Sequence, residues 1–263
     1  MGSCFSNGNT QLHLAAAAGD SAAVAALLGR RASVAAINVD GWTPLHSAAS
    51  RGCAEVIRLL VQGGASLEAR ASDGRTPLAV ACKAGEERAV RILLALGADA
   101  ATVDSRGRTA VHAAALASDA ALSAGVPAVL QELAQGGAPL NAVESATGRT
   151  ALHLLAARSG SAAAINMLLQ CGANAYIADR LEGGQTPLGC ALAAGNTSAV
   201  ELLLLPGSRR RTDGSALSPY PSAPPLQGSL QQPLQRSHST APAAMLPPRA
   251  PAPRPRHAHT KSM

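Results

Sequence analysis

The sequence predicts an all-α solenoid of stacked helix–turn–helix units with short β-hairpin fingers, followed by a disordered C-terminal tail. The main observation is a recurring phrase, Gly-x-Thr-x-Leu or Gly-x-Thr-x-Val, which begins at Gly41, Gly74, Gly107, Gly148 and Gly184. With a degenerate first copy at Thr10, the Thr residues of successive copies are 33, 33, 33, 41 and 36 positions apart. A period in this range is typical of repeat proteins, in which each unit buries its apolar face only against its neighbours.

Each unit carries signals for two helices. The Thr suits the N-cap of a first helix, because its hydroxyl can accept a hydrogen bond from a free helix N–H. Three copies continue with Pro at the first helical position, where a missing N–H costs nothing; these are Pro44, Pro77 and Pro187. A second apolar run then ends in Leu-Leu and is followed by Gly-Ala, as in Leu59-Leu60 and Gly64-Ala65. Such glycines predict left-handed caps at helix C-termini.

These motifs resemble the ankyrin repeat. The resemblance covers residues 9–205 as six repeats, with a leader at 1–8 and a tail at 206–263. The repeats span residues 9–39, 40–72, 73–105, 106–146, 147–182 and 183–205. The fourth has extra residues around 118–125, interpreted as an extended loop of Ala and Ser. The resemblance implies a protein-binding module whose hairpin tips and first helices form a concave groove.

Composition agrees with this fold class. Of the 263 residues, 47% are hydrophobic and only 2% aromatic, as expected where alanines let paired helices approach closely. No apolar run long enough for a transmembrane helix and no secretory signal are evident. The five cysteines are scattered without a Cys-x-x-Cys pair, which indicates a reducing compartment without disulfides or a zinc site. No cofactor and no small-molecule substrate are expected.

The positive charge belongs to the tail. Residues 1–205 hold 14 Lys/Arg and 15 Asp/Glu, whereas residues 206–263 have a net charge of +7. The tail is rich in Pro, Ser and Ala, a composition typical of disorder. A nucleic-acid-associated function using this tail is one alternative. It is disfavoured because the tail lacks interleaved aromatic residues and the repeats lack a basic net charge.

The N-terminus fits an acylation motif. Met1-Gly2-Ser3-Cys4-Phe5-Ser6 matches the pattern for myristoylation of Gly2, with Cys4 placed for palmitoylation. One myristoyl chain binds membranes only reversibly, so stable anchoring needs a second signal, which Cys4 or the basic tail would supply. We therefore expect the protein at the cytoplasmic face of a membrane. If the match is coincidental, a soluble cytosolic inhibitor or scaffold of the same fold is the alternative.

The tail also offers two candidate phosphorylation sites. Thr212 follows three arginines, and Ser239 follows Arg236 at a spacing that basophilic kinases favour. Each phosphate would remove about 1.5 to 2 units of positive charge and weaken attraction to an anionic leaflet. An unmodified tail is the simpler alternative.

The repeat register indicates a basic binding surface with one aromatic anchor. The position between Gly and Thr is occupied by Trp42, Arg75, Arg108 and Arg149. Nearby variable positions add Arg51, Lys83, Arg106 and Arg158. Trp and Arg are enriched among residues that dominate interface energies. We expect an acidic protein segment as partner, whereas the alternative is that these arginines are solvated fingertips without a ligand.

The sequence favours no catalytic chemistry. Four histidines occupy the same repeat position, which is typical of a packing role; they are His13, His46, His112 and His153. No nucleophile–base pattern, phosphate-binding loop or metal spacing is present. The sequence therefore predicts a non-catalytic adaptor or scaffold.

Overall fold

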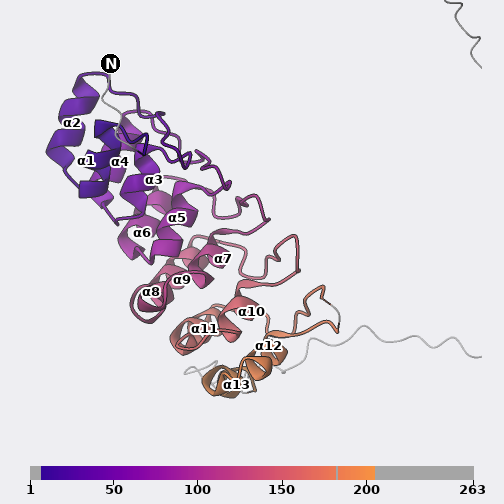
Figure 1. The fold of residues 1–263 in the computed structure, drawn as a ribbon. Helices are drawn as coiled ribbons and strands as arrows, with labels where there is room; N and C mark the ends of the chain where they lie inside the picture. Colours follow the sequence, from indigo (N-terminus) through magenta and orange to yellow (C-terminus); the bar gives the residue numbers. More distant parts are fainter. Residues whose placement is uncertain (1–6, 182, 205–263) are drawn as a thin grey trace, which may run out of the picture. The chain divides into compact units, whose positions relative to one another are not determined.

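The computed structural model describes residues 7–181 and 183–204, all within one compact unit. These residues form thirteen helices, of which twelve are arranged as six pairs, one pair for each repeat, and one, α8 (Asp119–Ala124), is an addition to the fourth repeat (Figure 1). The first helices of the pairs are α1 (Gln11–Ala18), α3 (Pro44–Ala49), α5 (Pro77–Ala84), α7 (Ala110–Ala115), α10 (Ala151–Ala156) and α12 (Pro187–Ala193). The second helices are α2 (Ser21–Gly29), α4 (Ala54–Gln62), α6 (Glu87–Ala95), α9 (Val126–Gln135), α11 (Ala162–Gln170) and α13 (Thr197–Leu204).

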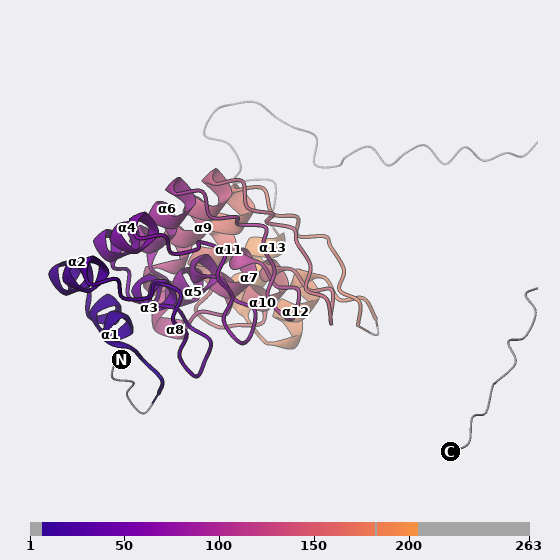
Figure 2. The same ribbon diagram turned by 90° about the horizontal axis from the view of Figure 1, so that it is seen from above.

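The helices stack in two layers. Each first helix packs against the first helix of the next repeat, and the second helices do the same in a parallel row (Figures 1 and 2). The fingers project from one side of this stack. The all-helical solenoid predicted from the repeat period is therefore confirmed.

The first helices are short and largely buried. In α3 all six residues are buried, and Thr43, Thr76 and the other Thr residues of the phrase stand at the N-caps as expected. Alanines at 48 and 49 have no exposed surface, so the adjacent helix approaches closely. Both rows contribute large core side chains, such as Leu45 and Leu78 from first helices and Leu60 and Leu93 from second helices, all almost completely buried.

The fingers are turns rather than strands. Each is closed by a pair of backbone hydrogen bonds, such as Ala71 N–H to the Arg75 carbonyl and Gly74 N–H to the Ala71 carbonyl, both at 2.9 Å. Each is also joined to the preceding finger, as where Ser72 N–H donates to the Asp40 carbonyl at 3.0 Å. No segment of residues 7–181 and 183–204 is long and regular enough to count as a strand. The predicted β-hairpin fingers are therefore hydrogen-bonded turns without β-strands.

The extra segment of the fourth repeat is a helix, so its interpretation as a loop was wrong. Helix α8 (Asp119–Ala124) begins at Ser118, whose hydroxyl accepts a hydrogen bond from Ala121 N–H. Alanine has the highest helix propensity, so the Ala/Ser composition favours a helix once a cap is present. The helix contacts α9 and α11 and lies against Gly85. A Cβ atom on Gly85, whose φ is +78°, would lie 2.9 Å from the Ala121 side chain, so the contact between α8 and this position requires glycine.

Within the described ranges, no helix is long and apolar enough to cross a bilayer. The predicted tail and leader lie mostly outside these ranges.

Candidate protein-binding surface

The repeated histidines join each repeat to the next. The Nδ1 atom of His46 lies 2.9 Å from the Thr43 hydroxyl and 3.1 Å from the Thr43 backbone N. Its Nε2 atom lies 3.1 Å from the Arg75 carbonyl of the following finger. Because a carbonyl only accepts, Nε2 carries the proton and Nδ1 accepts. The same arrangement joins His13 to Trp42, His112 to Arg149 and His153 to Gln185.

Burial keeps these histidines neutral. Burial lowers the pKa of His46 to about 4. The hydrogen bond to the Arg75 carbonyl raises the pKa, but by less than burial lowers it. Burial likewise lowers the pKa values of His13, His112 and His153 below the ordinary histidine value. In all four histidines, both ring nitrogens are hydrogen-bonded to other groups of the repeat array. These contacts support the structural role predicted for the histidines.

Three of the predicted partner-binding arginines brace the fingers. Arg75 pairs with Asp73 at 2.5 Å, and Arg108 pairs with Asp104 at 2.8 Å, each within its own finger. Asp104 is nearly inaccessible; burial alone would raise its pKa, but hydrogen bonds from Arg108 and Arg106 bring the pKa below its usual value. These guanidinium groups are therefore already engaged in internal ion pairs.

Arg149 is the third of these, and its partner lies in the next finger. It donates to the buried carboxylate of Asp179 at 3.1 Å. Burial opposes ionisation of Asp179, yet hydrogen bonds from Arg149, Gln185 and Leu181 lower its pKa overall. The pair therefore ties the finger that precedes α10 to the finger that precedes α12.

Arg158 has a different internal role. Its Nη1 atom donates to the carbonyls of Ala115 at 2.9 Å and Ala117 at 2.7 Å, and its Nη2 atom meets Asp119 at 2.5 Å. Ala115 ends α7 and Asp119 begins α8, so this side chain of the fifth repeat fastens the inserted helix of the fourth. The Arg158 side chain is 26% exposed.

The remaining candidates stay open to solvent. Arg51, Lys83 and Arg106 are exposed, and within residues 7–181 and 183–204 none of them forms an ion pair. Arg51 follows α3, Lys83 lies in the last turn of α5, and Arg106 lies in a finger. Trp42 is half-buried and stacks on His46 with ring centroids 6.2 Å apart. These four residues form the candidate binding set, which we call the open set.

Sequence reasoning did not identify the apolar residues on the fingers. Six large apolar side chains of the finger segments are exposed: Ile37, Val39, Val103, Val143, Tyr176 and Leu181. Three of them, Ile37, Val103 and Val143, directly precede the residue that donates the finger-closing bond, so the repeat register itself could have shown them. The aspartates that engage Arg75 and Arg108 were also visible nearby in the sequence.

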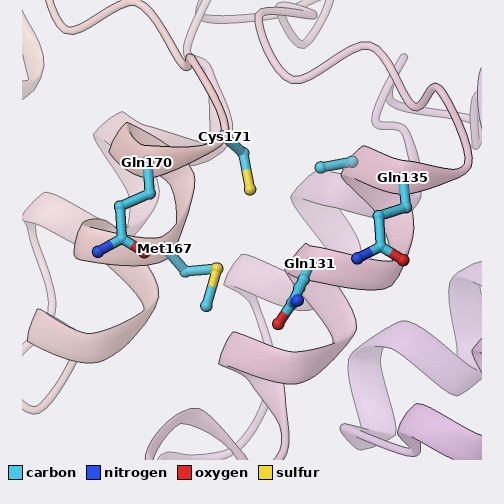
Figure 3. A pocket seen from close by; sticks show the side chains of 6 residues that line it. Gln131, Gln135, Met167, Gln170 and Cys171 are labelled. Carbon is cyan, nitrogen blue, oxygen red and sulfur yellow. The ribbon is translucent and has the colours of Figure 1, made fainter. Parts of the chain in front are cut away.

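A hollow of about 470 Å³ lies between α9 and α11, on the second-helix layer (Figure 3). Its walls are Gln131, Ala134, Gln135, Met167, Gln170 and Cys171. Burial raises the pKa of the Cys171 thiol, which keeps it protonated and weakly nucleophilic. None of the predicted binding residues lines this hollow. In the described part of the chain, no group of His, Cys, Asp and Glu side chains is arranged to hold a metal ion.

The stacked pairs, their histidine junctions and their short fingers define a tandem-repeat scaffold whose exposed side chains lie outside an alanine- and leucine-rich core. The sequence matches the family model described as "Ankyrin repeats (3 copies)" over residues 1–71, 64–119 and 117–211. The chain therefore belongs to the ankyrin-repeat family, whose members generally mediate protein–protein interaction. No curated protein matches the chain.

Four predicted modification sites lie outside the described residues. They are Gly2 and Cys4 in the leader, and Thr212 and Ser239 in the tail. Their roles stay predictions.

Proposed function

We propose that this chain is a non-catalytic ankyrin-repeat adaptor or scaffold, held at the cytoplasmic face of a membrane, that binds an acidic segment of a protein partner. The observation that supports acidic recognition is the division among the cations. Arg75, Arg108, Arg149 and Arg158 pair internally, whereas those of the open set do not. An exposed cation without a partner keeps its full attraction for an incoming carboxylate.

The chemistry of the open set favours recognition over catalysis. Arg51, Lys83 and Arg106 carry charge that steers an acidic segment and sets its register. Trp42 offers an aromatic surface held in place by its stacking on His46. Aromatic and arginine side chains are the types that contribute most when an interface desolvates them.

The membrane tether rests on the leader. Myristate on Gly2 would supply a reversible anchor, and palmitate on Cys4 or the basic tail would supply the second signal that stable anchoring needs. The tail's phosphorylation at Thr212 and Ser239 would lower its charge and release it from an anionic leaflet.

Binding to acidic peptides tests the recognition surface. An array of Asp- and Glu-rich peptides is measured against the full chain and against a Lys83→Glu, Arg106→Glu variant. We expect the variant to lose at least tenfold in affinity for the best peptide, because two attractive charges become repulsive. An Arg58→Glu, Arg88→Glu variant is the control, since both are exposed cations of second helices outside the open set and the change in net charge is the same. Equal losses in both variants would mean that net charge alone attracts the peptides, which contradicts the proposed site.

Acylation of the native N-terminus tests the tether. The chain and its Gly2→Ala variant are expressed with a myristate analogue and fractionated. Acylation and membrane recovery of the wild type, with a soluble Gly2→Ala variant, are the expected results. If neither chain is acylated, the protein is a soluble scaffold and the tether is wrong. A Thr212→Glu, Ser239→Glu variant with unchanged membrane recovery would contradict regulation through the tail.

A further inference from the structure

The first repeat departs from the others at the end of its second helix. Arg31 has a φ of +59° and is the only non-glycine residue with positive φ in the described ranges. The equivalent positions in the next four repeats are Gly64, Gly97, Gly137 and Gly172, all with positive φ. A side chain in this left-handed conformation costs on the order of 1 kcal/mol. An arginine therefore occupies a position where the fold itself favours glycine.

The position directs its side chain outward. A Cβ atom built on any of those four glycines meets nothing within 4 Å, so the side chain enters open space. Arg31 and its neighbour Arg30 are both exposed, and neither forms an ion pair within the described part of the chain. Both stand at the C-terminal end of α2, where the chain turns into the first finger. Neither cation stabilises a contact that the structure shows.

The first finger adds exposed apolar surface. Ile37 is 64% exposed and Val39 is 69% exposed, and within the described ranges only Tyr176 among the large apolar side chains is more exposed. The charged residue nearest to them along the finger is Asp40, whereas Asp20 caps the opposite end of α2. The first repeat therefore exposes two cations at the end of α2, and two aliphatic side chains and one carboxylate on the finger that follows. We call Arg30, Arg31, Ile37 and Val39 the N-terminal face.

The leader joins the protein at this same finger. The Asn7 carbonyl accepts a hydrogen bond from Val39 N–H at 3.3 Å, and Asn38 donates to the Asn9 side chain at 3.0 Å. Four residues, Ser3 to Ser6, separate the candidate acylation site Gly2 from Asn7. A fully extended chain spans at most about 3.6 Å per residue. An acyl chain on Gly2 would therefore hold the N-terminal face close to the bilayer.

We infer that the N-terminal face contacts an anionic lipid bilayer beside the acylated leader, with Arg30 and Arg31 on lipid headgroups and Ile37 and Val39 in the interfacial region. This inference rests on the proposed membrane tether and extends it to a surface of the folded repeats. Cations near an anionic leaflet and aliphatic side chains at the interface both strengthen attachment. It also explains why a strained arginine replaces glycine only in the repeat next to the leader.

Vesicle binding by the full chain tests the inference. Acylated chain and the Gly2→Ala chain are each titrated with vesicles of phosphatidylcholine alone and of phosphatidylcholine with phosphatidylserine. Arg31→Gly should weaken binding to the anionic vesicles about fivefold, and Arg30→Ala with Arg31→Gly about 25-fold. Binding to neutral vesicles should change little. Ile37→Ser with Val39→Thr should weaken binding to both vesicle types severalfold, because its contribution is apolar.

Arg31→Gly separates lipid contact from folding. The glycine removes backbone strain, so this variant should melt about 2 °C higher while binding lipid more weakly. Arg58→Ala with Arg88→Ala is the matched control for charge, because both are exposed cations of the second helices. Val143→Thr is the matched control for the apolar change, since it lies on a finger far along the array.

The outcomes distinguish the face from the tether. If the face variants bind as the wild type does, or if the control variants lose as much, the lipid-facing surface is overturned and acylation can still anchor the chain. If the face variants lose affinity in the Gly2→Ala background but acylation adds nothing, the surface stands and the tether is wrong. If the face variants lose affinity with and without the acyl chain, and the acyl chain itself adds affinity, both the lipid-facing surface and the tether are supported.

Discussion

Four junctions between repeats contain a buried histidine and one does not. At the second junction His46 links Thr43 to the Arg75 carbonyl of the next finger. At the third junction Ala79 occupies the histidine position, and within the described ranges the Arg108 carbonyl accepts only the finger-closing bond from Asp104. The helices still stack there, because α5 packs directly against α7.

This difference distinguishes the apolar packing that holds the helices together from the polar contacts that add to it. Burial of alanine and leucine faces holds neighbouring first helices together with or without the histidine. The histidine adds a satisfied polar bridge at the finger end of the helix. At the third junction the opposite end is reinforced instead, where α8 lies on Gly85 and Arg158 fastens α8 from the fifth repeat. Two different devices therefore stabilise junctions of one architecture.

The largest effect that sharpens this comparison is acid destabilisation through the histidines. Their folded pKa values lie below the ordinary value of 6.5, so between the folded and unfolded pKa values the unfolded chain binds more protons. Stability is fully present above pH 6.5 and falls as the pH decreases towards the folded values. For His46, with a pKa of about 4, the loss is about 3 kcal/mol. Urea unfolding at a series of pH values measures it.

A pH-independent free energy of unfolding between pH 7 and pH 4.5 would contradict neutral buried histidines. In a His46→Ala background the slope with pH should be smaller by the contribution of that one residue, which provides the internal control.

Removal of one histidine bridge should have the next largest effect. His46→Ala leaves a cavity and removes the partner of the Thr43 hydroxyl and of the Arg75 carbonyl, so we expect a loss of about 3 kcal/mol at pH 7. Urea unfolding at neutral pH is the measurement. A loss below about 1 kcal/mol would show that helix packing alone determines the stability of this junction.

Removal of the Arg158 contacts should cost less. Arg158→Ala leaves the carbonyls of Ala115 and Ala117 without this donor, and we expect a loss of about 1 to 2 kcal/mol. Hydrogen exchange should quicken in α8 more than in α4. Arg88→Ala, an exposed cation, is the control and should change stability by less than about 0.5 kcal/mol.

The smallest effect is a gain at the third junction. Ala79→His restores the histidine position below the Arg108 carbonyl, and we expect about 1 kcal/mol of added stability, together with a steeper loss of stability in acid. Thermal and urea unfolding both report it. Destabilisation would mean that the close packing of α5 on α7 leaves no room for the ring.

Most of the fold could be predicted from the repeat period of the sequence. Thr43 and Thr76 are N-caps, and Pro44 and Pro77 are first helical residues, because these roles depend on local backbone chemistry. The structural role of the histidines also followed from register. The inserted helix was missed because its composition suits both a loop and a helix, and its cap at Ser118 is a short-range signal that the interpretation did not weigh.

The sequence by itself determined the family, the number of repeats, the helix caps and the position of the basic residues. Only the tertiary structure decided which of those cations remain available. Arg149 pairs with Asp179, which is 30 positions away in the sequence, and Arg158 pairs with Asp119, which is 39 positions away. The physical reason is that stacking brings together residues about one repeat apart, and the exact register of neighbouring repeats depends on helix packing. The same folding joins Asn7 to Val39, 32 positions further along the chain, and no local sequence pattern indicates that contact.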